Sequence, residues 1–292
     1  MAPPPGLGAP RDALVHADTV SLLNLFQIPA PAATSSSQNF QDANLSVLLK
    51  KYPFSSIQNV HSLLAEAQGP NSSKVLIPEA LQIRMSAIRF DLHQSLNQTL
   101  SLMGKSPTFQ DAVSKALRVP PKVNKTEWVV CTTLEMYSLL ISSFGMLHSR
   151  CTDGTCPTMN ASEEISYAWA DGELVKTPIM VSAQKYVSLL NDWICSKLQN
   201  PSIFPVSDRF SKKTVSPLLK VMGKKLLRIF SHIYFCHWSF VLSVDCTDIM
   251  TLIFLISYHT CISFKLVDSK LDATTIDPVM LLRRQLGVPG SA

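Results

Sequence analysis

The sequence predicts a mainly α-helical fold with one small β-hairpin, and three observations support this. Apolar residues recur at spacings of three and four in several segments, which is the period of an amphipathic helix. Hydrophobic residues make up 46% of the 292 residues and charged residues 16%, enough apolar material for a packed core. A short stretch between two of the helical segments has the turn residues of a hairpin.

The first part of the chain divides in two. Residues 1–40 are rich in Pro, Ala and Ser, and we expect them to be disordered. Residues 41–118 are predicted to form a helical extension. One of its helices has an apolar stripe made of Leu81, Met85, Ile88, Leu92 and Leu96. This stripe either packs on a neighbouring helix or binds a partner. The polar face of that helix carries Arg84, Arg89 and Gln94. A further helix begins near Thr108 and ends before Pro120, because proline disfavours helix in the residue before it.

Residues 119–287 are predicted to form a second, mainly helical domain. It begins with one long helix from Glu127 to Leu147. Residues 167–172 and 176–180 are expected to form the hairpin, and Ala183 to Leu198 the next helix. Ser216 is a candidate N-cap with Pro217 at the first helical position, so a last helix is expected from there to about His237.

An apolar run from Ile249 to Phe264 raises the question of a membrane span. The run has 16 residues, short of the roughly 20 that cross a bilayer, and it includes Ser257 and His259. We therefore expect a buried strand or helix and no membrane span. The first residues lack the basic and apolar regions of a secretory signal, so the expected location is the cytoplasm, with the nucleus as a second location. In such a reducing compartment the seven cysteines are thiols or metal ligands.

Four residues have the chemistry of zinc ligands: Cys151, Cys156, His232 and His237. Two thiolates and two imidazoles would close a tetrahedral shell, which is typical of a structural zinc. The alternative is two free thiols and two unrelated histidines. Histidines five residues apart point about 140° apart on an ideal helix, so we expect the helix to distort there. Nothing near them suggests a nucleophile or base, so a hydrolytic zinc is not indicated.

A basic segment precedes the histidines. From Arg209 to Arg228 the sequence has seven basic residues and no acidic one. Lys220, Lys224 and Arg228 are four apart, with Lys225 beside them, and we expect their face to be exposed to solvent. Such a cluster can bind phosphate through charge-assisted hydrogen bonds, although an ordinary solvated face and a nucleic-acid surface are alternatives. The formal net charge of +5 permits an acidic or phosphorylated partner without requiring one.

An ordered set of motifs resembles the Mob (Mps one binder) family. The set comprises Glu127-Trp128, Cys151-x4-Cys156-Pro157-x-Met159, Tyr167-x-Trp169-Ala170-Asp171-Gly172, Ser182-Ala183-x-Lys185-Tyr186, Trp193, Phe204-Pro205 and His232-Ile233-Tyr234-x-x-His237. The resemblance implies a Mob-like helical bundle with a small hairpin and a structural Zn²⁺ on Cys2His2 ligands.

The resemblance also implies a function. Mob proteins act as non-enzymatic co-activators and scaffolds of NDR/LATS-class AGC kinases in Hippo or mitotic-exit type signalling, and they bind phosphorylated peptides of upstream kinases or scaffolds. The positions matching the family's phosphopeptide pocket are Lys224, Lys225 and Arg228, and those matching its kinase-binding face are Glu127 and Trp128. The alternatives are a zinc-containing nucleic-acid-binding or other interaction module that uses the basic helix, and a zinc hydrolase that uses Asp171 or Glu127.

One segment departs from the family pattern. Residues 238–262 show none of the family's usual continuation, which resumes at Ser263-Phe264-Lys265-Leu266-Val267-Asp268. Our hypothesis is that 238–262 is a divergent segment or a translated intron. Sequencing of the transcript across this region tests it, and an uninterrupted exon would exclude the intron.

Overall fold

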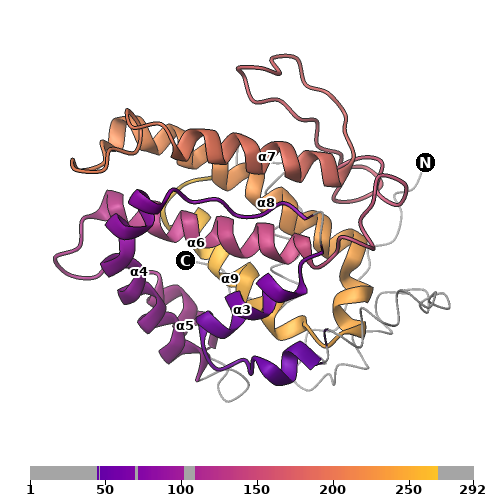
Figure 1. Ribbon diagram of the computed structural model, residues 1–292, viewed down its shortest axis with the longest axis horizontal. Helices are drawn as coiled ribbons and strands as arrows, with labels where there is room; N and C mark the ends of the chain where they lie inside the picture. The colour runs from indigo at the N-terminus through magenta and orange to yellow at the C-terminus, as the bar shows by residue number, and fades with distance from the viewer. Residues whose placement is uncertain (1–44, 46, 70–71, 102–108, 269–292) are drawn as a thin grey trace, which may run out of the picture. The chain divides into compact units, whose positions relative to one another are not determined.

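The computed structural model describes residues 45, 47–69, 72–101 and 109–268 (Figure 1). The predicted disordered residues 1–40, and residues 269–287 of the predicted second domain, lie outside this part of the chain. The fold is mainly α-helical, as expected. Its named helices are α3 (Ile57–Ala67), α4 (Glu79–Leu100), α5 (Phe109–Ala116), α6 (Lys125–Gly145), α7 (Ala183–Leu198), α8 (Lys212–Ser243) and α9 (Thr247–Ser263).

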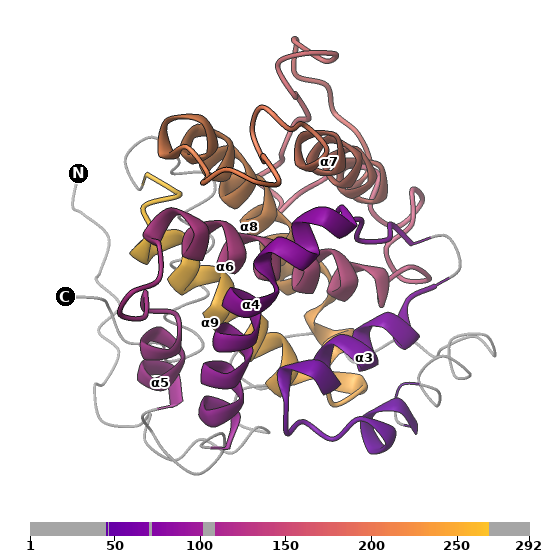
Figure 2. The ribbon, with the colours of Figure 1, turned by 60° about the vertical axis from the view of Figure 1, so that its left-hand side comes forward.

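Helix α6 lies at the centre of these elements and contacts α3, α4, α8 and α9 (Figure 2). It is long and apolar enough to cross a membrane by length and composition, but 89% of its apolar window is buried inside the protein. A helix in a protein core can have the same length and apolar composition as a membrane span, because other helices surround it where lipid would surround a span.

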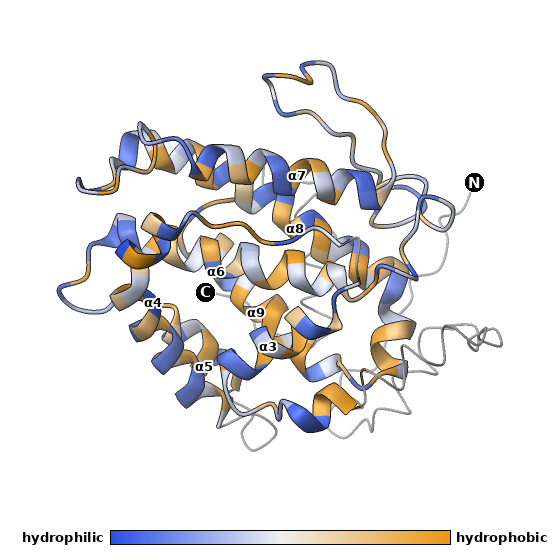
Figure 3. Cartoon of the chain, in the orientation of Figure 1, coloured by the Kyte–Doolittle hydropathy of each residue, from blue (hydrophilic) through white to orange (hydrophobic). Residues whose placement is uncertain are grey.

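Helix α9 forms the other part of the core. It contains most of the apolar run from Ile249 to Phe264, so that run is a buried helix and not a strand. The parts of α9 that are visible in Figure 3 are mostly hydrophobic. The helix packs on α5, α6 and α8, which explains why it is apolar on every side. The segment that departs from the family pattern therefore supplies core side chains.

The stripe predicted in the extension packs on neighbouring helices. Leu81, Met85, Leu92 and Leu96 are buried in α4, while Ile88 is half-buried. The polar face of α4 also makes contacts, because the Arg84 guanidinium pairs with Glu127 at 2.8 Å and Arg89 lies 3.4 Å from Glu135. The prediction of a helix packed on a neighbour is thus confirmed, and the neighbours are α3, α5 and α6.

Helix α7 has the predicted bounds, whereas α8 does not. The Ser182 side chain caps α7 by accepting from the Lys185 amide at 3.1 Å. Helix α8 begins after Ser211 and not at Ser216, so Pro217 lies inside it, and it continues past His237 to Ser243. Pro217 has no N–H for the carbonyl four residues earlier. The first turns form nevertheless, and the burial of Val215 and Leu219 stabilises them.

The predicted hairpin is not formed as a pair of strands in the described residues. Trp169 and Ile179 exchange two backbone hydrogen bonds, of 2.8 and 2.9 Å, as an isolated antiparallel bridge. Pro178 cannot extend the ladder because it lacks an N–H. The Asp171 carboxylate accepts from the amides of Glu173 and Val175, both at 2.8 Å, and the Asp171 amide donates to the Val175 carbonyl at 3.1 Å, so the chain turns at the expected place.

Candidate metal centre and basic site on α8

The four predicted zinc ligands meet in space. Cys151 and Cys156 lie in the loop after α6, and His232 and His237 lie on α8. All four side chains are buried, and their ligand atoms lie within 4.8 Å of one another. The Cys151 Sγ is 3.4 Å from the His232 Nε2, and the Cys156 Sγ is 3.4 Å from the His237 Nε2. This arrangement rules out the interpretation as unrelated residues.

The spacing fits a zinc ion. A Zn–S bond of about 2.3 Å and a Zn–N bond of about 2.0–2.1 Å at a tetrahedral angle place sulfur and nitrogen roughly 3.5 Å apart. The expected distortion of α8 is not observed, since the helix runs unbroken through both histidines, whose rings lie 5.1 Å apart. The His232 Nδ1 donates to the Asn160 carbonyl at 2.7 Å, which orients the ring and leaves Nε2 for the metal.

The electrostatics of the cluster favour a deprotonated sulfur. Hydrogen bonds with Cys151, His232 and His237 lower the pKa of the Cys156 thiol to about 2. Burial opposes this shift and is outweighed. The thiolate is the form of cysteine that binds metal. The residues present could therefore hold Zn²⁺, which would link the loop after α6 to α8.

The basic residues on α8 do not form the exposed face that the sequence predicted. Lys225 is only 8% exposed, its Nζ donates to the Ala170 carbonyl at 2.7 Å, and it lies 4.3 Å from the centre of the Trp169 ring. Burial, with a smaller effect from the charge of Arg228, lowers the pKa of Lys225 to about 8. A lysine at this position is held by an aromatic ring and a carbonyl, not by water.

Arg228 is held in the same way, one turn further along α8. Its guanidinium donates to the Tyr186 hydroxyl at 3.2 Å and lies 4.8 Å from the Tyr167 ring centre. Tyr167 and Tyr186 belong to the motifs that resemble the Mob family, but the sequence alone assigns them no role. Their role is to fix two cations close together, with the half-buried Lys224 next to them.

Lys220 does not join this group. It is exposed and lines a separate cavity together with Lys212, nearer the start of α8. The row of basic residues predicted along one helix face is therefore divided between two places.

The positions matched to a kinase-binding face lie among the residues of the extension. Trp128 is fully buried, and its Nε1 donates to the Leu117 carbonyl at 2.8 Å. The Glu127 side chain is 20% exposed and is paired with Arg84 of α4. The structure thus gives Trp128 a packing role and covers Glu127 with α4.

A second buried cluster surrounds Glu135, and no sequence motif indicates it. The Glu135 carboxylate of α6 lies 2.5 Å from the His61 Nε2 of α3 and 3.0 Å from the His93 Nε2 of α4, with Arg89 at 3.4 Å. These short distances are those of direct ion pairs and hydrogen bonds. Burial alone would raise the pKa of Glu135. The charge of His61 and the hydrogen bonds from both histidines outweigh burial and hold this pKa well below its usual value. The cluster connects α3 and α4 to α6.

The chain was compared with known proteins. The sequence model of the Mob1/phocein family matches residues 106–274. "MOB kinase activator-like 1 homolog B" from Dictyostelium discoideum is 34% identical over 184 residues, which cover 62% of this chain and 81% of that protein. "MOB kinase activator-like 1A" from Medicago sativa subsp. falcata is 36% identical over 132 residues, 44% of this chain and 61% of the relative. "MOB kinase activator-like 3" from Drosophila melanogaster is 28% identical over 187 residues, 63% of this chain and 80% of the relative.

Proposed function

The chain belongs to the Mob1/phocein family, and on that premise we propose that it is a non-enzymatic kinase co-activator and scaffold. The family model covers more than half of the chain, and the relatives described above are named as kinase activator-like proteins. Four Cys and His ligands would complete a tetrahedral shell around zinc and leave no open position for a substrate, which supports a structural zinc and not a catalytic one.

We propose that the structural Zn²⁺ is held by Cys151, Cys156, His232 and His237. When bound, zinc would supply a fixed link between the loop after α6 and the middle of α8. Arg228 precedes the first histidine by one helical turn, so the same link would fix the position of the basic site.

The observation that carries the proposal is that two cations of α8, Lys225 and Arg228, are held against aromatic rings from other segments. We propose that Lys224, Lys225 and Arg228 bind the phosphate of a phosphorylated peptide. Burial lowers the pKa of Lys225, and a phosphate beside it would stabilise its charged form. Arg228 could make two parallel hydrogen bonds to phosphate oxygens while the lysines act as point charges.

The proposed partners follow from the family. They are an NDR/LATS-class AGC kinase and a phosphorylated upstream kinase or scaffold, in Hippo or mitotic-exit type signalling, with no nucleic acid and no membrane span. The proposed location is the cytoplasm and the nucleus, which imaging of the tagged chain would test. Mass spectrometry of kinases captured by the chain would identify the partner, and a set without AGC kinases would contradict this part of the proposal.

The phosphopeptide site is tested by titration of one synthetic peptide in phosphorylated and unphosphorylated form. Wild type should bind only the phosphorylated peptide. Arg228→Ala should weaken binding by about tenfold to a hundredfold, because a hydrogen bond to a charged group contributes roughly 1.5–3 kcal/mol. Lys220→Ala is the matched control, since it removes a basic residue from the same helix outside the site, and it should bind like wild type. Equal affinity for the two peptides would overturn the proposal.

A further inference from the structure

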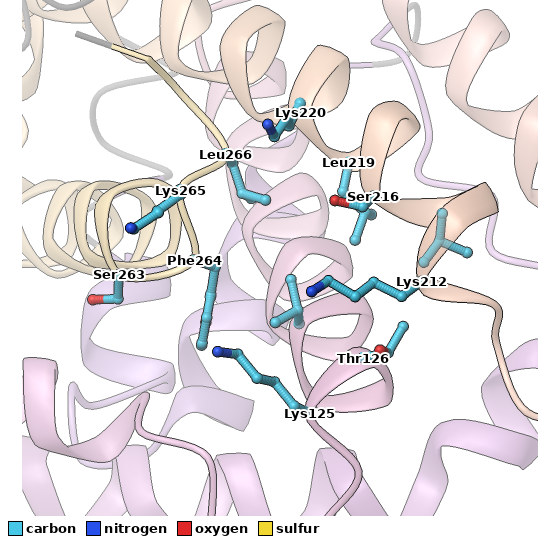
Figure 4. Close-up of a pocket in the computed structure, with 12 residues that line it drawn as sticks. Lys125, Thr126, Lys212, Ser216, Leu219, Lys220, Ser263, Phe264, Lys265 and Leu266 are labelled. Atoms are coloured by element: carbon cyan, nitrogen blue, oxygen red, sulfur yellow. The ribbon is translucent and has the colours of Figure 1, made fainter.

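A second basic cavity, separate from the site above, lies where the starts of α6 and α8 meet the end of α9. It has a volume of about 440 Å³ and is lined by four lysines, Lys125, Lys212, Lys220 and Lys265, and by no acidic residue (Figure 4). Its floor is apolar, because Leu219 and the ring of Phe264 contribute to its lining. It therefore has apolar surface within a basic rim.

The lysines surround the cavity in a particular way. Figure 4 shows the side chains of Lys125 and Lys212 extending toward the same space beside Phe264, while Lys220 and Lys265 lie further out. Among the residues that the structure describes, no carboxylate forms an ion pair with any of the four. Their charges are uncompensated within the described part of the chain.

The position of two of these lysines is electrostatically unfavourable. Lys125 is the first residue of α6 and Lys212 the first residue of α8. A helix carries roughly half a positive charge at its N-terminus, so a lysine there is repelled and an acidic residue is favoured. The first turn of α8 has no acidic residue, and its Ser211 cap makes no side-chain hydrogen bond. The first turn of α6 contains Glu127, which is paired with Arg84, so an anion bound in the cavity would relieve the repulsion chiefly at the start of α8.

We propose that this cavity binds an acidic peptide segment of another protein through one apolar anchor residue. The recessed apolar floor can receive one side chain, whereas a membrane surface would require a protruding apolar face. Lysines spread around a rim suit several carboxylates, whereas recognition of one phosphate usually employs the planar fork of arginine. The undescribed ends of this chain offer no match by sequence, since residues 1–44 and 269–292 contain no run of acidic residues.

This inference does not depend on the proposed phosphopeptide site, because the two sites have no residue in common. The probe is a fluorescein-labelled peptide with one phenylalanine among glutamates, and its binding is followed by fluorescence anisotropy at low and moderate salt. Wild type should bind it, and replacement of the phenylalanine by serine should weaken binding. The double variant Lys125→Gln/Lys212→Gln should weaken binding about tenfold, as expected for two exposed ion pairs.

Lys176→Gln is the matched control, since it removes an exposed lysine that lines neither this cavity nor the pocket beside it. It should bind the probe like wild type, as should Arg228→Ala. The double variant should unfold at no lower temperature than wild type, because it removes charge from two helix N-termini. Three outcomes would overturn the proposal: no binding of the probe, equal loss in Lys176→Gln and in the double variant, or a preference for phosphatidylserine vesicles or for a phosphopeptide without glutamates.

Discussion

Lys225 provides a quantitative test of how the basic site is built. We consider Lys225→Met, which keeps an unbranched apolar side chain while it removes the charge. In the wild type the ammonium group donates to the Ala170 carbonyl and faces the Trp169 ring, and burial lowers its pKa to about 8 from the ordinary 10.5. The charged form of this side chain is therefore less stable in the folded chain than in the unfolded chain.

The sign and size of the effect follow from proton linkage. Between pH 8 and 10.5 the unfolded chain holds the proton on Lys225 while the folded chain does not, so this residue makes stability rise with pH in that window. The charge costs the wild type about 3 kcal/mol at pH 7, and most of that cost disappears by pH 10. The unfolding free energy of Lys225→Met minus that of wild type should therefore be ~2 kcal/mol larger at pH 7 than at pH 10.

Urea unfolding of both proteins at pH 7, 8.5 and 10, followed by circular dichroism, measures this difference. Groups that titrate in the same range but lie away from Lys225 contribute equally to both proteins and cancel in the subtraction. A stability difference that does not change with pH would refute the conclusion that Lys225 is desolvated. Phosphopeptide affinity in Lys225→Met should fall at every pH.

Three further predictions concern the core and the metal centre. Cys151→Ser should lose zinc by metal analysis and melt well below wild type, because the free energy of metal binding also stabilises the fold; a wild-type protein purified without zinc would contradict the site. Trp128→Phe should cost about 1–3 kcal/mol in urea unfolding by leaving the Leu117 carbonyl unsatisfied, without changing phosphopeptide affinity. Glu135→Leu should cost about 3–5 kcal/mol near neutral pH by leaving the His61 and His93 rings without their carboxylate partner and Arg89 without its counter-charge, and the cost should shrink as pH falls through the lowered pKa of Glu135; an unchanged unfolding midpoint would argue against this cluster.

Features that depend on neighbours in the sequence could be predicted from the sequence. The apolar periodicity of α4, α6 and α7 was enough to predict these helices, because burial of one helix face requires only apolar residues at the right spacing. The start of α7 was correct because its cap is local, with Ser182 accepting from an amide three residues later. The zinc ligands were predicted from residue chemistry and from the order of the motifs that accompany them.

Features that depend on distant segments were decided by the tertiary structure. Helix α8 begins before Pro217 and not at it, and packing of Val215 and Leu219 accounts for the difference. Helical periodicity placed Lys225 on an exposed face, but the Trp169 segment covers it, and the sequence pattern of α8 carries no information about that segment. Lys220 was assigned to the same row and instead borders a cavity formed with residues from α6 and the end of α9. Whether a charged side chain is solvated depends on which segment packs against it, and local sequence cannot determine that contact.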